Sequence, residues 1–134
     1  MTVRTSGTQP ITIEQDIVVA RQLARKLAQE CGMRLIDLTK MVTAVSELAR
    51  NTMVYGGGGH MDWQIIEEGM RTGLRVTFRD DGPGIPDLKL AMTDGWTSGS
   101  GLGLGLTGAK RLVEEFDLET TPGVGTRVTI TRWT

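Results

Sequence analysis

The stretch LRVTFRDDGPGIPD, residues 74–87, joins a strand-like pattern directly to a turn rich in glycine and proline. Apolar side chains occupy every second position of its first half, which predicts a strand over about residues 73–80 with one apolar face. Two aspartates and a Gly-Pro-Gly turn follow at once. The sequence therefore predicts that Asp80 lies at the end of a half-buried strand, beside a turn that lets the backbone come close to another group.

The segments around this strand predict three long helices and four more strands. We expect helices over about residues 15–31, 35–54 and 104–116, a short helical piece near 87–92, and strands over about 9–13, 61–68, 117–121 and 125–132. Asp16 is the expected N-cap of the first helix. Pro10 predicts that the first strand lies at a sheet edge, because proline cannot donate to a ladder. The order of elements separates strands from long helices, which predicts an α+β, two-layer sandwich.

Composition bounds the class of protein. The 134 residues suit a single domain spanning residues 1–134. Fifteen Lys and Arg face 16 Asp and Glu, so there is no global positive field to attract nucleic acid. The single cysteine, Cys31, and the lack of a signal-peptide pattern or a long apolar run predict a cytoplasmic protein without membrane contact. His60 is also single, so a bound metal is expected to be a hard cation with oxygen ligands.

A second glycine-rich stretch, WTSGSGLGLGLTGAKR at 96–111, precedes the expected third long helix. Glycines let consecutive backbone N–H groups turn toward one point, as in phosphate cradles, and a helix N-terminus adds positive charge. The dinucleotide motif G-x-G-x-x-G fits residues 103–108 but lacks the preceding first strand of a βαβ unit. The P-loop motif fails because Ala109 and Lys110 follow Gly108. A loop without a ligand is the remaining alternative, and Lys110 and Arg111 are interpreted as a solvated helix face.

Four short motifs in a fixed order give the site a family. ELARN at 47–51, DDGPG at 80–84, GSGLGLGL at 99–106 and GVGT at 123–126 resemble the N box, two glycine boxes and final glycine-threonine motif of the GHKL ATP-binding superfamily. That superfamily has the Bergerat fold, which implies a mixed, mostly antiparallel sheet covered by helices on one face. The longer stretches at 14–32, 44–55 and 101–120 resemble the serine/threonine switch kinases of the bacterial stressosome.

The resemblance implies a role for each polar motif residue. Asn51 is the implied ligand of a Mg²⁺ that bridges the phosphates of ATP, and an amide oxygen suits this cation. Glu47, one helical turn earlier, is the implied base for the incoming hydroxyl. Asp80 is the implied acceptor for the adenine amine, with Thr126 completing the contact. Tyr55 is open between a nucleotide contact and a core position.

The glycines are implied to shape the nucleotide site. Gly82 and Gly84 allow close approach of the backbone to the base and sugar. The remaining four, Gly99, Gly101, Gly103 and Gly105, are expected to form a lid that closes over ATP.

Two functions are consistent with these motifs. The first is an ATP-dependent serine/threonine protein kinase that phosphorylates a STAS-domain anti-sigma-factor antagonist of a stressosome, and then binds and activates a downstream phosphatase or other effector. The second is a nucleotide-dependent anti-sigma factor that acts mainly by sequestering a sigma factor. A histidine kinase is disfavoured because His60 follows a glycine loop instead of lying on a long helix.

Overall fold

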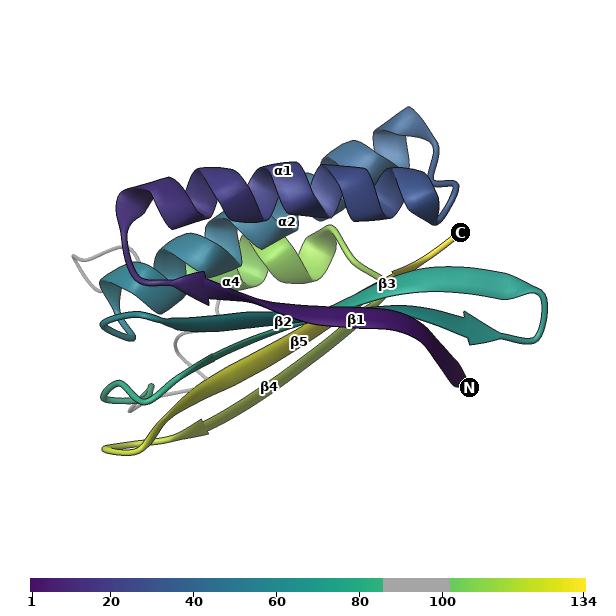
Figure 1. Cartoon of the computed structure of the whole chain (residues 1–134). Coiled ribbons are helices and arrows are strands. Elements are labelled where there is room, and N and C mark those ends of the chain that lie inside the picture. The colour runs from purple at the N-terminus through teal and green to yellow at the C-terminus, as the bar shows by residue number, and fades with distance from the viewer. Residues whose placement is uncertain (86–101) are drawn as a thin grey trace.

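The computed structural model describes residues 1–85 and 102–134, in which helices pack against one face of a sheet (Figure 1). In chain order the elements are β1 (Thr2–Ile11), α1 (Glu14–Glu30), α2 (Leu35–Val54), β2 (Gly59–Glu68), β3 (Arg71–Asp80), α4 (Leu102–Arg111), β4 (Glu115–Thr121) and β5 (Gly125–Trp133). The strands lie in the order β1-β2-β3-β5-β4, and every pair among these described strands is antiparallel. The two-layer α+β prediction is confirmed.

The central strand β3 separates the two faces of the sheet by simple alternation. Leu74, Val76 and Phe78 are buried in the core shared with the helices. Phe78 pairs with Met61 of β2 on one side and Val128 of β5 on the other. Burial of a side chain such as Phe78 contributes about 1.5–3 kcal/mol. Polar side chains take the alternate positions of β3, so the register of the strand fixes which side chains face the helices.

The helix α2 lies between α1 and α4 and also contacts β1, β2 and β3. Its buried stripe includes Leu38, Met41, Val45 and Leu48, at the spacing of one helix face. Because α2 crosses the sheet in this way, its C-terminal end comes to the end of β3 where Asp80 lies. Among the described helices, none is long and apolar enough to cross a membrane.

Three expected boundaries are wrong. The third long helix ends at Arg111 instead of 116, and Glu115 and Phe116 belong to β4. Buried and exposed positions alternate along β4, and Phe116 packs against the core from it. The few apolar residues of this segment are too short a run for the sequence to distinguish this strand pattern from a helix. The first strand starts at Thr2, because its polar residues pair with β2 along the sheet edge. Its edge position, expected from Pro10, is confirmed.

The N-cap of α1 also differs from the prediction. The helix begins at Glu14, and Asp16 lies inside the first turn instead of at the N-cap. From there the Asp16 carboxylate accepts hydrogen bonds from the backbone amides of Thr12, at 2.9 Å, and Ile13, at 3.1 Å. These two backbone hydrogen bonds lower the pKa of Asp16. The helical piece expected near 87–92 lies outside the described residues.

Candidate active site

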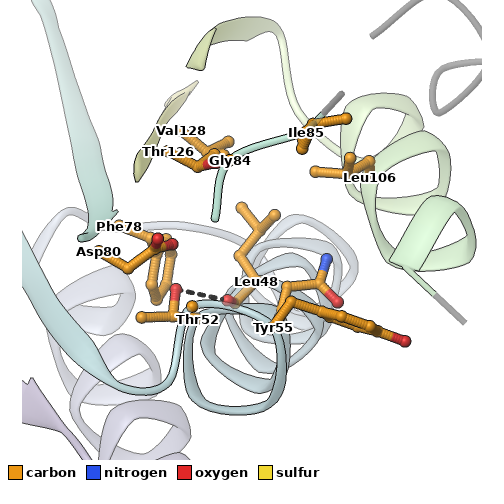
Figure 2. Close-up of a pocket in the computed structure, with 12 residues that line it drawn as sticks. Leu48, Thr52, Tyr55, Phe78, Asp80, Gly84, Ile85, Leu106, Thr126 and Val128 are labelled. Atoms are coloured by element: carbon orange, nitrogen blue, oxygen red, sulfur yellow. Dashed lines mark hydrogen bonds between the residues drawn. The ribbon is translucent and has the colours of Figure 1, made fainter. Parts of the chain in front are cut away.

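A pocket opens where the C-terminal end of α2, the end of β3, the start of β5 and α4 meet (Figure 2). Its empty volume, with the open mouth included, is about 420 Å³. Leu48, Phe78, Ile85, Leu106 and Val128 supply most of its apolar wall. The polar side chains come from two places, the strand ends and the end of α2.

At the strand ends the polar group is Asp80. It is half-buried, and burial raises the pKa of its carboxyl group. The backbone amides of Gly82 and Thr126 both donate to the carboxylate and oppose that rise, the first over 2.9 Å. Nearby Asp81 adds to the rise. The carboxylate is therefore held in place by two amides and faces an apolar pocket, where a donor on a ligand would be bound strongly.

The glycine after the N box fits this carboxylate closely. A Cβ on Gly56 would overlap the side chain of Asp80, and a Cβ on Gly82 would lie 2.7 Å from the Cα of Gly56. Gly56 also lines the pocket. Gly56 stands outside the four motifs, and the signal for it in the sequence is its place as the first of four glycines directly after Tyr55. Gly56 and Gly82 leave no room for a side chain, because the backbone around each of them packs closely against the Asp80 carboxylate.

Two glycine motifs that are far apart in the sequence pack against each other. The backbone amide of Gly123 donates to the carbonyl of Pro83 over 2.7 Å. Gly84 has φ +74°, and a Cβ there would lie 2.5 Å from the carbonyl oxygen of Thr121. A side chain at Gly84 is thus disfavoured both by the backbone conformation and by contact. The turn after β3 and the hairpin between β4 and β5 form one wall of the pocket.

At the end of α2, two polar groups lack partners. The side-chain nitrogen Nδ2 of Asn51 and the hydroxyl of Tyr55 are both buried, and neither has a hydrogen-bond partner within the described ranges. Both residues line the pocket. A buried polar group without a partner costs about 1–3 kcal/mol, so two of them at one pocket point to a ligand that satisfies them. For Tyr55, which the sequence left open, the structure gives a pocket position.

Glu47 lies apart from this pocket. It is exposed on α2, one turn before Asn51, and lines a separate polar groove between α1 and α2. Arg21 and Arg25 of α1 line the same groove, as do Thr43 and other polar residues of α2. The structure therefore brings Asn51 into the pocket and leaves Glu47 on an adjacent surface.

The other predicted residues divide in the same way. Thr126 and Gly84 line the pocket with Asp80. Gly82 is not among the lining residues, and its backbone amide donates to the Asp80 carboxylate. The backbone places Gly103 and Gly105 in the first turn of α4, because that helix begins at Leu102 and not at 104. Gly99 and Gly101 lie outside the described residues. Lys110 and Arg111 are exposed on α4.

The donor set for a metal ion is small. Within residues 1–85 and 102–134, no group of three or more His, Cys, Asp or Glu side chains is arranged to hold a metal. Asn51 lines the pocket, and its Nδ2, like the Tyr55 hydroxyl, has no hydrogen-bond partner among the described residues. A single amide oxygen fits Mg²⁺ that keeps most of its waters and binds mainly through phosphates.

Comparison with known proteins gives the site a family. Residues 36–133 match the family described as histidine kinase-, DNA gyrase B-, and HSP90-like ATPase. Serine/threonine-protein kinase RsbT of Bacillus subtilis (strain 168) is 43% identical over 92% of this chain and 92% of its own length. Anti-sigma F factor of Clostridium novyi (strain NT) is 35% identical over 69% of this chain and 68% of its own.

A solved structure supports the same fold. The crystal structure of the RsbU and RsbW domains of Rv1364c from Mycobacterium tuberculosis matches with a TM-score of 0.65 and 22% identity. The match covers 96% of this chain and 31% of that longer one. At this identity the likeness shows the fold alone.

The chain belongs to the family of histidine kinase-, DNA gyrase B- and HSP90-like ATPases. Within it, the similarity to RsbT over almost the whole chain makes it an enzyme of the serine/threonine protein kinase branch. The resemblance carried by the four sequence motifs is confirmed, and use of ATP follows from the family.

Proposed function

We propose that this kinase transfers the terminal phosphate of ATP to a serine or threonine of a STAS-domain anti-sigma-factor antagonist. The observation that carries the proposal is the pairing of a pocket holding Asp80 and two unpartnered polar groups with a polar groove holding Glu47, one turn of α2 away. Phosphoryl transfer needs little covalent chemistry from the protein, mainly positioning and charge neutralisation. A pocket that holds the nucleotide, next to a groove that receives the acceptor protein, would position the two reactants for transfer.

The strand end of the pocket is proposed to hold adenine. Asp80 accepts a hydrogen bond from the exocyclic amine, because an ionised carboxylate offers only acceptors. Its two backbone amide partners keep it from turning away. Thr126 lies beside it and completes the contact with the base. The apolar wall excludes water and strengthens both hydrogen bonds.

The α2 end of the pocket is proposed to hold the phosphates. Asn51 presents its amide to Mg²⁺, and Tyr55 donates its hydroxyl to the sugar or to a phosphate oxygen. The Nδ2 of Asn51 and the hydroxyl of Tyr55 are buried and have no partner among the described residues. Both can donate to oxygens of the ligand while the amide oxygen of Asn51 is left for the cation, so binding gains hydrogen bonds without breaking any within that part of the chain. Bound Mg²⁺ would neutralise negative charge as the phosphoryl group leaves.

The groove between α1 and α2 is proposed to receive the acceptor protein. Glu47 takes the proton of the incoming hydroxyl, an effect worth about 10²–10⁴ in rate. Arg21 and Arg25 line the groove, and neither has a salt bridge with another described residue. Unpaired cations at a groove favour an acceptor with acidic residues around its serine or threonine.

Release of the phosphorylated acceptor then frees the groove for a second partner. We propose that this partner is a phosphatase or other effector, which the kinase activates by binding. One surface that serves two partners in turn gives a switch, because occupation by either excludes the other.

A second candidate is an anti-sigma factor that sequesters a sigma factor. The similarity to anti-sigma F factors favours it. The same nucleotide pocket supports both functions, so the partner that occupies the groove decides between them.

The test is incubation of the protein with radiolabelled ATP and candidate STAS proteins. We expect label on a STAS serine or threonine, and a loss of about 10²–10⁴ in transfer rate with unchanged nucleotide affinity in Glu47→Gln. Glu30→Gln, at an exposed position at the end of α1, is the matched control and should transfer normally. Undiminished transfer by Glu47→Gln would remove the base assignment. No transfer, with stable binding of a sigma factor in a pull-down, would favour the second candidate.

A further inference from the structure

Arg50 stands between the two polar residues that the proposed function uses on α2. It directly precedes Asn51, follows Glu47 by three residues and is exposed. Its guanidinium forms a salt bridge with the carboxylate of Glu14 at the start of α1, with Nη1 and Oε1 3.7 Å apart. The pair therefore joins the start of α1 to the end of α2, which lie at the same end of the helix layer (Figure 1).

The backbone that carries Glu14 is held in place. Asp16, in the same first turn of α1, accepts hydrogen bonds from the two backbone amides that directly precede the helix. The glycine loop after α2 comes close to the same turn, since a Cβ on Gly58 would lie 3.3 Å from the carbonyl oxygen of Ile11. The position of Glu14 beside α2 is therefore set by fixed backbone.

Glu47 is the competing partner for Arg50. Residues three apart are neighbours on a helix surface, and an acid that precedes a base by three residues forms a stabilising pair. Arg50 nevertheless pairs with Glu14, and Glu47 has no salt bridge with any residue in the described part of the chain. A cation bound to a carboxylate stabilises its charged form, so Glu47 would be a weaker base if Arg50 were bound to it.

We propose that Glu14 is a positioning residue that holds Arg50 away from Glu47, so that the Glu47 carboxylate stays free to take the proton of the acceptor hydroxyl. The inference rests on the proposed kinase function, in which Glu47 is the base. Arg21 and Arg25 of α1 also line the groove beside Glu47. Arg50 differs from them because it lies on the same helix as Glu47, at the spacing of a surface pair.

Exposed apolar side chains lie next to the Glu14–Arg50 pair. Val18 follows Glu14 by one helical turn and is 41% exposed, and Val54 follows Arg50 by one turn and is 53% exposed. Ile13, directly before Glu14, is 55% exposed. An acceptor protein that covers these side chains also removes water from the pair, whose charges are then screened less than in the free protein. The position of Arg50 therefore matters most in the complex, where transfer occurs.

The test is a double-mutant cycle on phosphate transfer from ATP to a STAS protein. We expect Glu14→Gln to lower kcat about fivefold with unchanged KM for ATP, the factor produced by an exposed ion pair at the upper end of its usual strength. In a chain that already carries Arg50→Gln, the same substitution should leave kcat unchanged, because no cation is left to occupy Glu47. Glu30→Gln removes the same charge at the other end of α1 and is the matched control, which should transfer normally.

Crystal structures of the wild type and Glu14→Gln give a second readout that needs no acceptor. We expect the Arg50 guanidinium beside Glu14 in the wild type and within about 4 Å of the Glu47 carboxylate in the variant. An Arg50 that stays away from Glu47 in the variant, or an equal loss of kcat with and without Arg50, would overturn the inference. Movement of Arg50 onto Glu47, in a protein that transfers phosphate to no STAS protein, would support the inference and count against the proposed function.

Discussion

Folding disfavours the ionised form of the Asp80 side chain. Burial is the largest influence on its carboxyl group and raises its pKa above the ordinary value of 3.8. A carboxyl group whose pKa is raised by folding binds its proton more tightly in the native state than in the unfolded chain. The protonated carboxyl group of Asp80 therefore stabilises the native state fully below pH 3.8, and this stabilisation is lost as the pH rises through the native pKa. At neutral pH the ionised Asp80 costs stability, which suits a residue kept for binding.

Replacement of Asp80 separates these two effects. Asp80→Asn should raise the stability of the free protein at neutral pH, because no charge is buried. It should weaken ATP binding about 10- to 100-fold, because the charge-assisted hydrogen bond to the adenine amine is lost. Urea unfolding and calorimetry measure the two quantities. Asp81→Asn, at the adjacent exposed position, is the control and should bind ATP nearly normally; tight binding by Asp80→Asn would contradict the adenine placement.

The site residues fall into those that the sequence could identify and those that it could not. Asn51 and Asp80 stand in short motifs whose spacing is local, so they were found before the fold was known. Glu14 and Gly56 matter through contacts with residues distant in the chain, and no local spacing encodes such contacts. The separation of Glu47 from the pocket likewise depends on how α1 packs beside α2.

At the scale of elements, Arg132 of β5 ties two helices to the sheet. Its guanidinium donates to the carbonyl of Leu112, just after α4, over 2.9 Å, and to the carboxylate of Asp37 in the first turn of α2. The Arg132 side chain is only 13% exposed. A cation near the end of α4 and an anion near the start of α2 both complement the helix dipoles. The helix that follows residues 86–101 is thereby held at its C-terminal end.

Removal of this link should loosen α4. Arg132→Met keeps an unbranched apolar stem and deletes the hydrogen-bond donors, so it should lower the free energy of unfolding by about 1–3 kcal/mol. Urea unfolding measures the change. Arg127→Met is the control, because Arg127 is 56% exposed in its salt bridge with Glu119 and exposed pairs contribute little. Equal effects of the two substitutions would show that Arg132 does not join the layers.

Element existence was easier to predict than element ends. The apolar stripes of α1 and α2 and the alternation of β3 are strong periodic signals, and all three elements lie where expected. The residues after α4 include Leu112 and Val113 of the connecting segment and Phe116 of β4, whose spacing suits a helix in isolation. Tertiary pairing of β4 with β5 overrides that local preference.

Across the whole molecule, ion pairs between described residues lie on both faces, including Arg50 with Glu14 on the helix side. On the face of the sheet away from the helices, charged side chains pair across strands, as in Asp62 with Arg79 and Glu119 with Arg127. On the helix side, Arg21 and Arg25 have no salt bridge within residues 1–85 and 102–134 and line a groove with Glu47. The two arginines in this groove favour the helix side of the molecule, beside the end of α2, for the proposed acceptor protein.

Nucleotide binding should be visible as a change in stability of the whole chain. A ligand that binds only the native state stabilises it by about 2.7 kcal/mol at 100 times its dissociation constant. Saturating ATP with Mg²⁺ should therefore raise the unfolding temperature of the wild type, and omission of Mg²⁺ should reduce the shift. The shift is expected because ATP is proposed to satisfy polar groups that are buried and have no partner within residues 1–85 and 102–134.

Asn51→Ala tests which part of that stabilisation passes through the metal. The variant removes the amide that is proposed to bind Mg²⁺, so its unfolding temperature in ATP should be the same with and without Mg²⁺. Without nucleotide it should be at least as stable as the wild type, because a buried unpartnered nitrogen is deleted. Differential scanning calorimetry of both proteins, with Asn51→Asp as a variant that keeps an oxygen donor, measures each comparison. A full Mg²⁺-dependent shift in Asn51→Ala would mean that the metal is held elsewhere, because a ligand stabilises the fold only through the groups it contacts.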